Sequence, residues 1–283
     1  MFRGIGRLRA RAAEAPALDL SFLLSETVDS RLTTSGGANG TRVNSAGVIV
    51  AATTPRFDYD PVTLAAKGLM SEEARTNLLL NSKLDGTSLA TQSVTVTAAA
   101  HTLTFYGTGT VTLSGVSTAG PLVGSGVYPA RSTLTFTPTA GSLTLTVSGS
   151  VQFANLELGS FATSFIPTAG ATVTRTADSV SMASAEVLGW LSTTAGALVA
   201  EADIGGYTLN GSFPLIASLD DGTNNNRITL FQGSSVVGLN LLIRNGGVAG
   251  TTSDTADAAV NTVFKLAGAY DAAGSSTALN GGA

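Results

Sequence analysis

The sequence predicts an all-β protein in which an N-terminal adaptor with a short helix precedes two antiparallel β-sandwiches. Short runs of alternating apolar and polar residues recur between Gly, Pro and Ser/Thr turns, as expected of strands with one buried and one solvated face. Of the 283 residues, 43% are apolar and 12% are charged, against about 25% charged in ordinary globular chains. The surface must therefore be covered by Ser, Thr, Asn and Gly, and the length exceeds that of one sandwich domain.

Composition and periodicity divide the chain into four segments. Residues 1–17 are a basic arm, residues 18–82 an adaptor, residues 83–182 a first sandwich and residues 183–283 a second, incomplete one. Four of the 15 basic residues lie in residues 1–11, which leaves 11 basic against 19 acidic residues, or −8, for the rest of the chain. An acidic body argues against nucleic acid as the main partner.

The adaptor contains three short predicted elements. SGGANG, residues 35–40, is typical of a flexible turn, and GVIV, residues 47–50, of a short buried strand. SEEARTNLLL, residues 71–80, is the best helix candidate, because Ser71 can cap it and Glu72 and Glu73 in its first turn suit the helix dipole. A helix this short depends on packing.

Alternating runs predict the strands of both sandwiches. In the first sandwich they cover residues 93–98, 101–107, 109–115, 132–138, 141–149 and 151–158. In the last segment a short helix over 183–191 precedes strands over 196–204, 213–221, 226–233, 238–245 and 262–271. With so few strands visible there, we expect either that the chain continues beyond Ala283 or that another subunit completes the edge of the sheet.

Several classes of chemistry lack the residues they need. The chain has no cysteine, which excludes disulfides and thiolate sites. Its one histidine, His101, cannot form a multi-histidine metal site and is expected to be an ordinary satisfied side chain. Nucleotide-binding and zinc-protease motifs are absent. The apolar stretch after the arm is interrupted by Asp19 and has no convincing cleavage site, so a secretory signal peptide is not expected. No run of about 18 apolar residues is present, so no transmembrane helix is expected. We therefore expect no cofactor, no metal and no membrane insertion.

Residues 55–82, PRFDYDPVTLAAKGLMSEEARTNLLLNS, are the most distinctive part of the chain. Aromatic and charged residues alternate at strand spacing ahead of Pro61, which predicts aromatic side chains on one face and charges on the other. Each arginine has carboxylates close by in sequence, so we interpret the segment as a structural junction tied by ion pairs rather than a ligand site. The junction residues are Arg56, Phe57, Asp58, Tyr59, Asp60, Glu72, Glu73 and Arg75.

This segment resembles one in the head spikes and tail fibres of tailed bacteriophages and gene-transfer-agent-like particles, which typically read PRFDYDP followed by GLLIEEARTNLL. In those proteins a segment similar to DPRITFSRAST often precedes it, and this sequence departs from that pattern at SGGANG. A second stretch, residues 151–182, resembles the exit of carbohydrate-binding-module-like jelly rolls in such appendages, LE-x-G-x-x-A-T-S-[FY]-I-P-T. The matching residues are Leu156, Glu157, Gly159, Ala162, Thr163, Ser164, Phe165, Ile166, Pro167 and Thr168. The segments after residue 183 resemble the opening half of concanavalin-A-like and laminin-G-like lectin domains.

The resemblance implies a jelly-roll-like sandwich and an incomplete concanavalin-A-like sandwich in a noncatalytic virion structural protein. Such a head spike or fibre would be assembled in the host cytoplasm, bind other capsid or tail proteins through residues 1–50 and attach to host surface polysaccharide. A homo-oligomer, by fibre analogy a trimer, is expected. The residues expected to dock to the particle are Arg3, Arg7, Arg9, Arg11, Phe22, Leu23 and Leu24.

Two candidate ligand sites and two other functions remain open. Asp220, Asp221, Asn224, Asn225 and Asn226 are the densest group of oxygen ligands, and form either a glycan-binding or calcium-binding loop or a polar hairpin turn. The aromatic candidates for sugar contact are Phe105, Tyr106 and Tyr128, of which the first two must point to opposite faces of their strand. The alternative functions are a capsule-degrading glycan hydrolase, although no persuasive carboxylate pair is visible, and a ligand-free decoration or collar protein.

Overall fold

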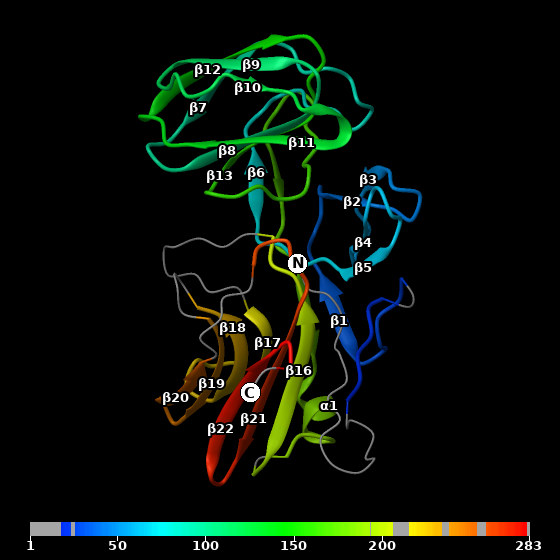
Figure 1. Ribbon diagram of the computed structural model, residues 1–283, viewed down its shortest axis with the longest axis vertical. Helices are drawn as coiled ribbons and strands as arrows, with labels where there is room; N and C mark the ends of the chain where they lie inside the picture. Colours follow the sequence, from blue (N-terminus) through cyan, green and yellow to red (C-terminus); the bar gives the residue numbers. More distant parts are fainter. Residues whose placement is uncertain are drawn as a thin grey trace. The chain divides into compact units, whose positions relative to one another are not determined.

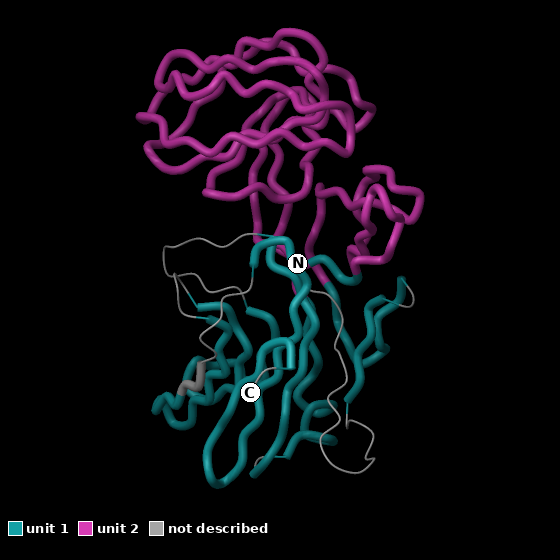
Figure 2. Tube along the Cα trace, in the orientation of Figure 1, with its two compact units in different colours: residues 1–34, 68–70, 180–283 teal, residues 35–67, 71–179 magenta. Residues whose placement is uncertain are grey.

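The computed structural model describes residues 18–23, 26–192, 194–205, 215–233, 238–253 and 259–281. The described chain is almost entirely β (Figure 1), so the predicted fold class is confirmed at the level of antiparallel β-sandwich architecture. It divides into two compact units (Figure 2). Residues 35–67 and 71–179, magenta and labelled unit 2 in the figure, are called the first unit in the text, and residues 1–34, 68–70 and 180–283, teal and labelled unit 1, are called the second unit. The segment predicted as a separate adaptor is therefore shared between the two units, and its larger part belongs to the same unit as the first sandwich.

The first unit contains a sandwich of two antiparallel sheets. One sheet has the order β10-β9-β12-β7 and the other the order β11-β8-β13. The strands are β7 (Gln92–Val96), β8 (His101–Gly107), β9 (Thr110–Gly115), β10 (Leu122–Val123), β11 (Gly126–Phe136), β12 (Gly141–Ser148) and β13 (Gln152–Leu158). All of their pairings are antiparallel. The six alternating runs predicted from the sequence lie on strands of this sandwich, and β10 was not predicted.

One hydrophobic core lies between these two sheets. Leu103 and Phe105 from β8 and Leu143 and Leu145 from β12 are completely buried in it. On each strand the core residues alternate with residues of the opposite face, so the period-two pattern of the sequence becomes one packed face per sheet. This burial of apolar surface is the main source of stability for the unit.

Short strands flank the sandwich within the same unit. They are β2 (Thr41–Val43), β3 (Ile49–Ala51), β4 (Phe57–Tyr59), β5 (Ala66–Leu69), β6 (Arg75–Asn77) and β14 (Val173–Arg175), paired as β2-β3, β4-β5 and β6-β14. Strand β5 ends in residues assigned to the other unit. The GVIV strand forms as β3, but its residues are half-buried or exposed rather than buried.

The helix predicted over residues 71–80 is wrong, because this segment is extended and forms β6. In the first turn of a helix the backbone N–H of Glu72 would have no partner within the helix and would need a capping side chain. Here it donates to the carboxylate of Asp178 at 2.8 Å. Thr76 pairs with Thr174 of β14 through their hydroxyl groups at 2.7 Å. Tertiary partners about a hundred residues away thus outweigh a weak local helical preference.

SGGANG, residues 35–40, is also not a free turn. Gly37 N–H donates to the carbonyl of Thr176 at 3.2 Å, and Thr176 N–H returns a bond to the carbonyl of Ala38 at 3.3 Å. The side chain of Asn39 adds a bond to the Thr174 carbonyl at 3.1 Å. The predicted turn forms, with Gly40 N–H donating to the Gly37 carbonyl at 3.0 Å, but it is bonded to residues 174–176 rather than free.

The second unit contains two further antiparallel sheets around a core of its own. One has the order β16-β21-β22 and the other the order β17-β18-β19-β20. The strands are β16 (Gly196–Ala202), β17 (Leu215–Asp220), β18 (Arg227–Gln232), β19 (Leu239–Asn245), β20 (Val248–Ser253), β21 (Phe264–Asp271) and β22 (Gly274–Leu279). Leu230, Leu239, Leu241 and Leu266 are completely buried between the sheets. The five predicted strands form, while β20 and β22 were not predicted.

Three shorter elements complete the described chain. Helix α1 (Ser184–Leu188) lies within the predicted 183–191 segment and buries none of its residues. Strand β1 (Leu32–Ser35) pairs with β15 (Ser179–Met182). Among the described residues we find no helix with the length and apolarity that a membrane crossing requires.

Candidate functional site: a buried arginine and carboxylate network

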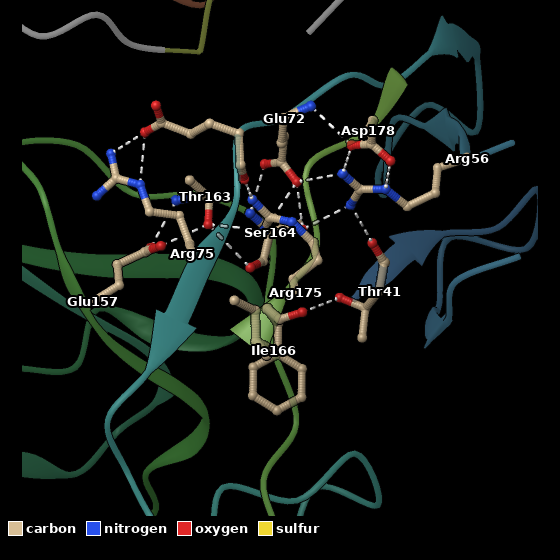
Figure 3. A network of polar contacts seen from close by, with 12 residues as sticks. Thr41, Arg56, Glu72, Arg75, Glu157, Thr163, Ser164, Ile166, Arg175 and Asp178 are labelled. Carbon is tan, nitrogen blue, oxygen red and sulfur yellow. Dashed lines mark hydrogen bonds and ion pairs between the residues drawn. The ribbon is translucent and has the colours of Figure 1, made fainter. Parts of the chain in front are cut away.

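The carboxylate of Glu72 is the centre of a polar network in the first unit (Figure 3). Its Oε2 lies 2.9 Å from Arg56 Nη2 and 3.2 Å from Arg175 Nη1. The backbone N–H and the hydroxyl of Ser164 donate to the two carboxylate oxygens at 2.8 and 2.6 Å. Two cations and two donors therefore surround this one carboxylate, so its hydrogen-bonding capacity is used within the chain.

Arg56 connects Glu72 to Asp178. Its Nε donates to Asp178 Oδ1 at 3.0 Å and its Nη2 to Asp178 Oδ2, which is the paired geometry of guanidinium and carboxylate. Its Nη1 donates to the carbonyl of Thr41 at 3.1 Å and to the Ser164 hydroxyl at 3.0 Å. The residue is 1% exposed, so it is one of the largest side chains buried in the unit.

Arg175 is buried beside Arg56 and holds residues 157–168, called the exit segment. Its Nη1 donates to the hydroxyl groups of Thr163 and Ser164 at 3.0 and 3.1 Å, and its Nη2 donates to the carbonyl of Glu73. Thr163 in turn donates its N–H and hydroxyl to the carboxylate of Glu157, at 2.8 and 2.6 Å. Thus the ion pairs of residues 56–75 and the motif of residues 157–168 form one continuous network.

The pKa shifts follow from burial and from these charges. Burial alone would raise the pKa of Glu72, but Arg175, Arg56 and the two bonds from Ser164 lower it to about 2. Burial raises the pKa of Glu157, with partial compensation by Thr163. The pKa of Arg56 is raised because its partners Asp178 and Glu72 outweigh its burial. Glu72 is therefore ionised at neutral pH and does not serve as a proton donor there.

Two buried asparagines fasten the same exit segment to the sandwich. Asn77 donates to the carbonyls of Ala154 and Ile166 at 3.0 and 2.8 Å, and its Oδ1 accepts the N–H groups of Leu79 and Leu156. Asn155 accepts Ile166 N–H at 3.1 Å and donates to the carbonyl of Ser164 at 3.0 Å. These amides satisfy backbone groups that no sheet partner reaches, which is why polar residues occupy fully buried positions.

Gly159 is required by the same packing. It has φ of +135°, and a Cβ there would lie 1.6 Å from Nη1 of Arg75. The Arg75 guanidinium also lies 4.7 Å from the centre of the Phe161 ring, and its Nε donates to Glu73 at 2.7 Å. The glycine of the exit motif and the arginine of the EEARTN motif therefore occupy adjoining space, which no reading of either motif alone reveals.

The rest of the predicted junction lies in or beside β4. Phe57 is buried, Tyr59 is half-buried, and Asp60 accepts the N–H groups of Val62 and Thr63 at 2.9 and 2.8 Å. Asp58 was expected on a charged outer face but is 4% exposed, and burial raises its pKa. The exposed position predicted for Asp58 is wrong, because its Oδ1 accepts the backbone N–H of Val43 in the neighbouring hairpin at 2.9 Å.

The predicted oxygen-ligand loop forms the turn between β17 and β18. Asp221 accepts the N–H and hydroxyl of Thr223 at 2.9 and 2.6 Å and the side-chain amide of Asn226 at 2.7 Å. Asp220 accepts Gly222 N–H at 3.0 Å. Among the described residues no group of three or more His, Asp or Glu side chains is arranged to hold a metal ion. The loop thus forms the predicted polar hairpin turn, while its role as a glycan-binding or calcium-binding loop stays a prediction.

The aromatic candidates for sugar contact pack against other aromatic rings or in the core. Phe105 is fully buried in the sandwich core. Tyr106 points to the opposite face, where its ring centroid lies 5.1 Å from that of Tyr128 and 6.2 Å from that of Phe153, in edge-to-face geometry. His101 is 1% exposed and bonds to the Ala99 carbonyl at 2.8 Å, as expected of a satisfied histidine.

Most of the residues expected to dock to a particle cannot be placed. Arg3, Arg7, Arg9, Arg11 and Leu24 lie outside the described residues. Leu23 is 37% exposed, whereas Phe22 is 4% exposed. The expected contact through the Phe22 ring is therefore corrected: this ring is packed within the chain and is not presented at the surface.

Sequence reasoning identified the arginines and carboxylates of residues 56–75 but missed most of their partners. Asp178, Arg175, Ser164 and Asn77 received no structural role, although all four are central to the network. The signal available for Ser164 was the exit motif that contains it. No family model matches the chain, and neither a curated protein nor a solved structure is significantly similar to it.

Proposed function

We propose that the protein is a noncatalytic virion structural protein, a head spike or fibre that docks to the particle through its N-terminal region and presents β-sandwiches to host surface glycans. One observation carries the proposal. The two segments that resemble phage appendage proteins, residues 55–82 and 156–168, contribute side chains to a single buried network. Segments with one shared structural role are expected to occur together in a family of scaffolds.

The state of the charged groups in these segments supports a scaffold over a reaction centre. Glu72 is held by two arginines, with its pKa lowered to about 2, and Asp178 is paired with Arg56. A glycosidase needs one carboxylic acid that stays protonated and faces a sugar beside a second carboxylate. Glu157 has a raised pKa but is fully buried, and both of its oxygens accept bonds from Thr163. The acidic groups of the motifs are thus used for structure.

Attachment would act through many weak contacts. Several copies on one particle raise avidity by roughly 10²–10⁴ over a single contact, so each sandwich needs only modest affinity. A homo-oligomer, by fibre analogy a trimer, fits this mode of binding. Sedimentation equilibrium of the purified chain tests that part of the proposal, because a monomer at micromolar concentration contradicts it.

Cryo-electron microscopy of assembled particles tests the docking. We expect density for the chain at a capsid vertex or on the tail, with the sandwiches projecting outward, and loss of that density from particles whose copy of the chain lacks residues 1–17. Incubation of purified chain with host capsular polysaccharide tests glycan attachment and the noncatalytic part of the proposal. Retention of the chain on the polysaccharide without shortening of the polymer supports the proposal, whereas release of oligosaccharides contradicts its noncatalytic part.

A further inference from the structure

Two arginines lie directly opposite each other on the outer face of the four-stranded sheet. Arg227 of β18 is in register with Arg244 of β19. Their neighbours Ile228 and Ile243 point to the core, so both arginines point away from it. Like charges at directly opposed positions destabilise a sheet. The sequence therefore tolerates a repulsive pair at this position.

No carboxylate among the described residues forms an ion pair with either arginine. The ion pairs among the described residues of this unit are Arg31 with Asp29 and Lys265 with Glu201. Asp220 faces Arg227 across β17 and β18, yet its carboxylate bonds to the Ser218 hydroxyl at 2.9 Å and to Gly222 N–H. By contrast, Arg56, Arg75 and Arg175 of the other unit each contact a carboxylate.

Asn224 holds the two guanidinium groups together. Arg227 Nη1 donates to the side-chain oxygen of Asn224 at 3.2 Å, and Arg244 Nη1 donates to its backbone carbonyl, also at 3.2 Å. The Nε atoms of both arginines are buried and have no hydrogen-bond partner. Each guanidinium thus keeps unused donors, although a buried donor without a partner costs free energy.

The turn around this pair is hydrogen-bonded to the next turn of the same sheet. Asn226 accepts Gly246 N–H at 2.8 Å, and Gly247 N–H donates to the carbonyl of Asn225 at 3.0 Å. These bonds join the β17–β18 turn to the β19–β20 turn at one end of the sheet (Figure 1). Asn224 of the polar turn thus contacts both arginines, and the residues of both turns are exposed around them.

We propose that Arg227 and Arg244 form an oxyanion site whose ligand is a sugar carboxylate of an acidic polysaccharide. Guanidinium groups bind carboxylates through paired N–H donors, and an anion between two arginines removes their repulsion. The chain carries a net charge of −4, so its overall field does not attract an anionic polymer and recognition must be local. The polysaccharide part of this assignment rests on the proposed function, while the anion site itself does not.

Titration calorimetry of the full chain with an oligoglucuronate and with a neutral glucose oligosaccharide of equal length tests the site. We expect preference for the acidic oligomer and a loss of about tenfold or more in affinity for each of R227Q and R244Q, as for a lost charged hydrogen bond. K265Q is the matched control, because it removes one positive charge from an exposed side chain of the same unit. It should change the affinity less than twofold.

Stability without ligand gives a second readout. If the pair is built for an anion, R227Q and R244Q remove repulsion and leave Tm unchanged or raised. A clear fall in Tm for both variants assigns the arginines to structure and overturns the inference.

The two proposals can fail separately. Equal binding of acidic and neutral oligomers that neither variant changes overturns this site and leaves glycan attachment standing. Perturbation of the Arg227 and Arg244 Nε–H resonances by free glucuronate, together with no retention on host polysaccharide, supports the anion site and contradicts the proposed function.

Discussion

Replacement of Glu72 by Gln is the most direct test of the network in the first unit. The substitution keeps the shape of the side chain but removes the charge that Arg56 and Arg175 share. Ser164 can still donate to one oxygen, whereas Arg175 loses its carboxylate contact while remaining fully buried. We therefore expect a large loss of stability in this unit rather than a change of fold.

The pKa of Glu72 gives the expected magnitude. Its fall from 4.5 to about 2, at about 1.4 kcal/mol per pKa unit, corresponds to about 3 kcal/mol of stabilisation of the folded state. Loss of one partner from a buried ion pair costs about 3–5 kcal/mol, because the other charge stays buried. We expect the free energy of unfolding of E72Q to be lower by about 3 kcal/mol at pH 7.

The same loss must depend on pH with a definite sign. The folded-state pKa of Glu72 lies below its unfolded value, so its contribution is complete above pH 4.5 and disappears as the pH falls toward about 2. Gln does not titrate. The difference between wild type and E72Q should therefore shrink across this interval. Other carboxyl groups, including Asp58 and Glu157 with their raised pKa values, are present in both proteins and cancel in the comparison.

Urea denaturation followed by circular dichroism measures the difference, and hydrogen exchange of peptides from residues 155–178 locates it. The one tryptophan, Trp190, lies in the other unit, so its emission reports on that unit. E73Q is the control, because Glu73 is half exposed and its pairing with Arg75 is worth about 0–1 kcal/mol. Equal losses for E72Q and E73Q, or a difference that does not shrink in acid, would refute the reasoning.

Three further predictions follow from the same unit and from the polar turn. Gly159→Ala should destabilise by about 1–3 kcal/mol, since it combines a φ of +135° with a Cβ in the space of the Arg75 guanidinium; a smaller loss in an R75A background, measured by urea denaturation, checks the contact. Asn77→Ala should cost about 3 kcal/mol or more because four buried backbone groups lose a partner, and an unchanged urea midpoint contradicts this. Calcium or a chelator should leave Tm unchanged, since Asp221 is bonded within its own turn; a rise of Tm with calcium would restore the metal interpretation.

The sandwich strands were predictable because their pattern is local. β8 covers residues 101–107, as the alternation of apolar and polar residues indicated, and each side chain on such a strand needs only its own position to choose a face. β6 could not be found in this way. Its three residues are Arg75, Thr76 and Asn77, and the acidic residues before them imitate the first turn of a helix.

The network was predictable only in part, for a similar reason. Carboxylates close in sequence predicted ion pairs for Arg56 and Arg75, and both arginines form such pairs, with Glu72 and Glu73. The strongest partner of Arg56 is Asp178, which lies 122 residues further along the chain. Sequence spacing carries no information about contacts at that separation, and the opposed pair Arg227 and Arg244 became visible only once the register of β18 and β19 was known.

The separation between Arg56 and Asp178 also has a consequence for biosynthesis. At about 5–20 residues per second, a ribosome needs roughly 6–24 s to add the 122 residues between these partners. Throughout that time Arg56 lacks its partner Asp178, and Arg175, which also pairs with Glu72, is made only three residues before Asp178. The last strands of the sandwich are made before residue 163, so the sheets can form while the network is still open. The exit segment therefore docks last. Because its contacts join residues far apart in the chain, we expect its docking to be the slow step in the folding of this unit.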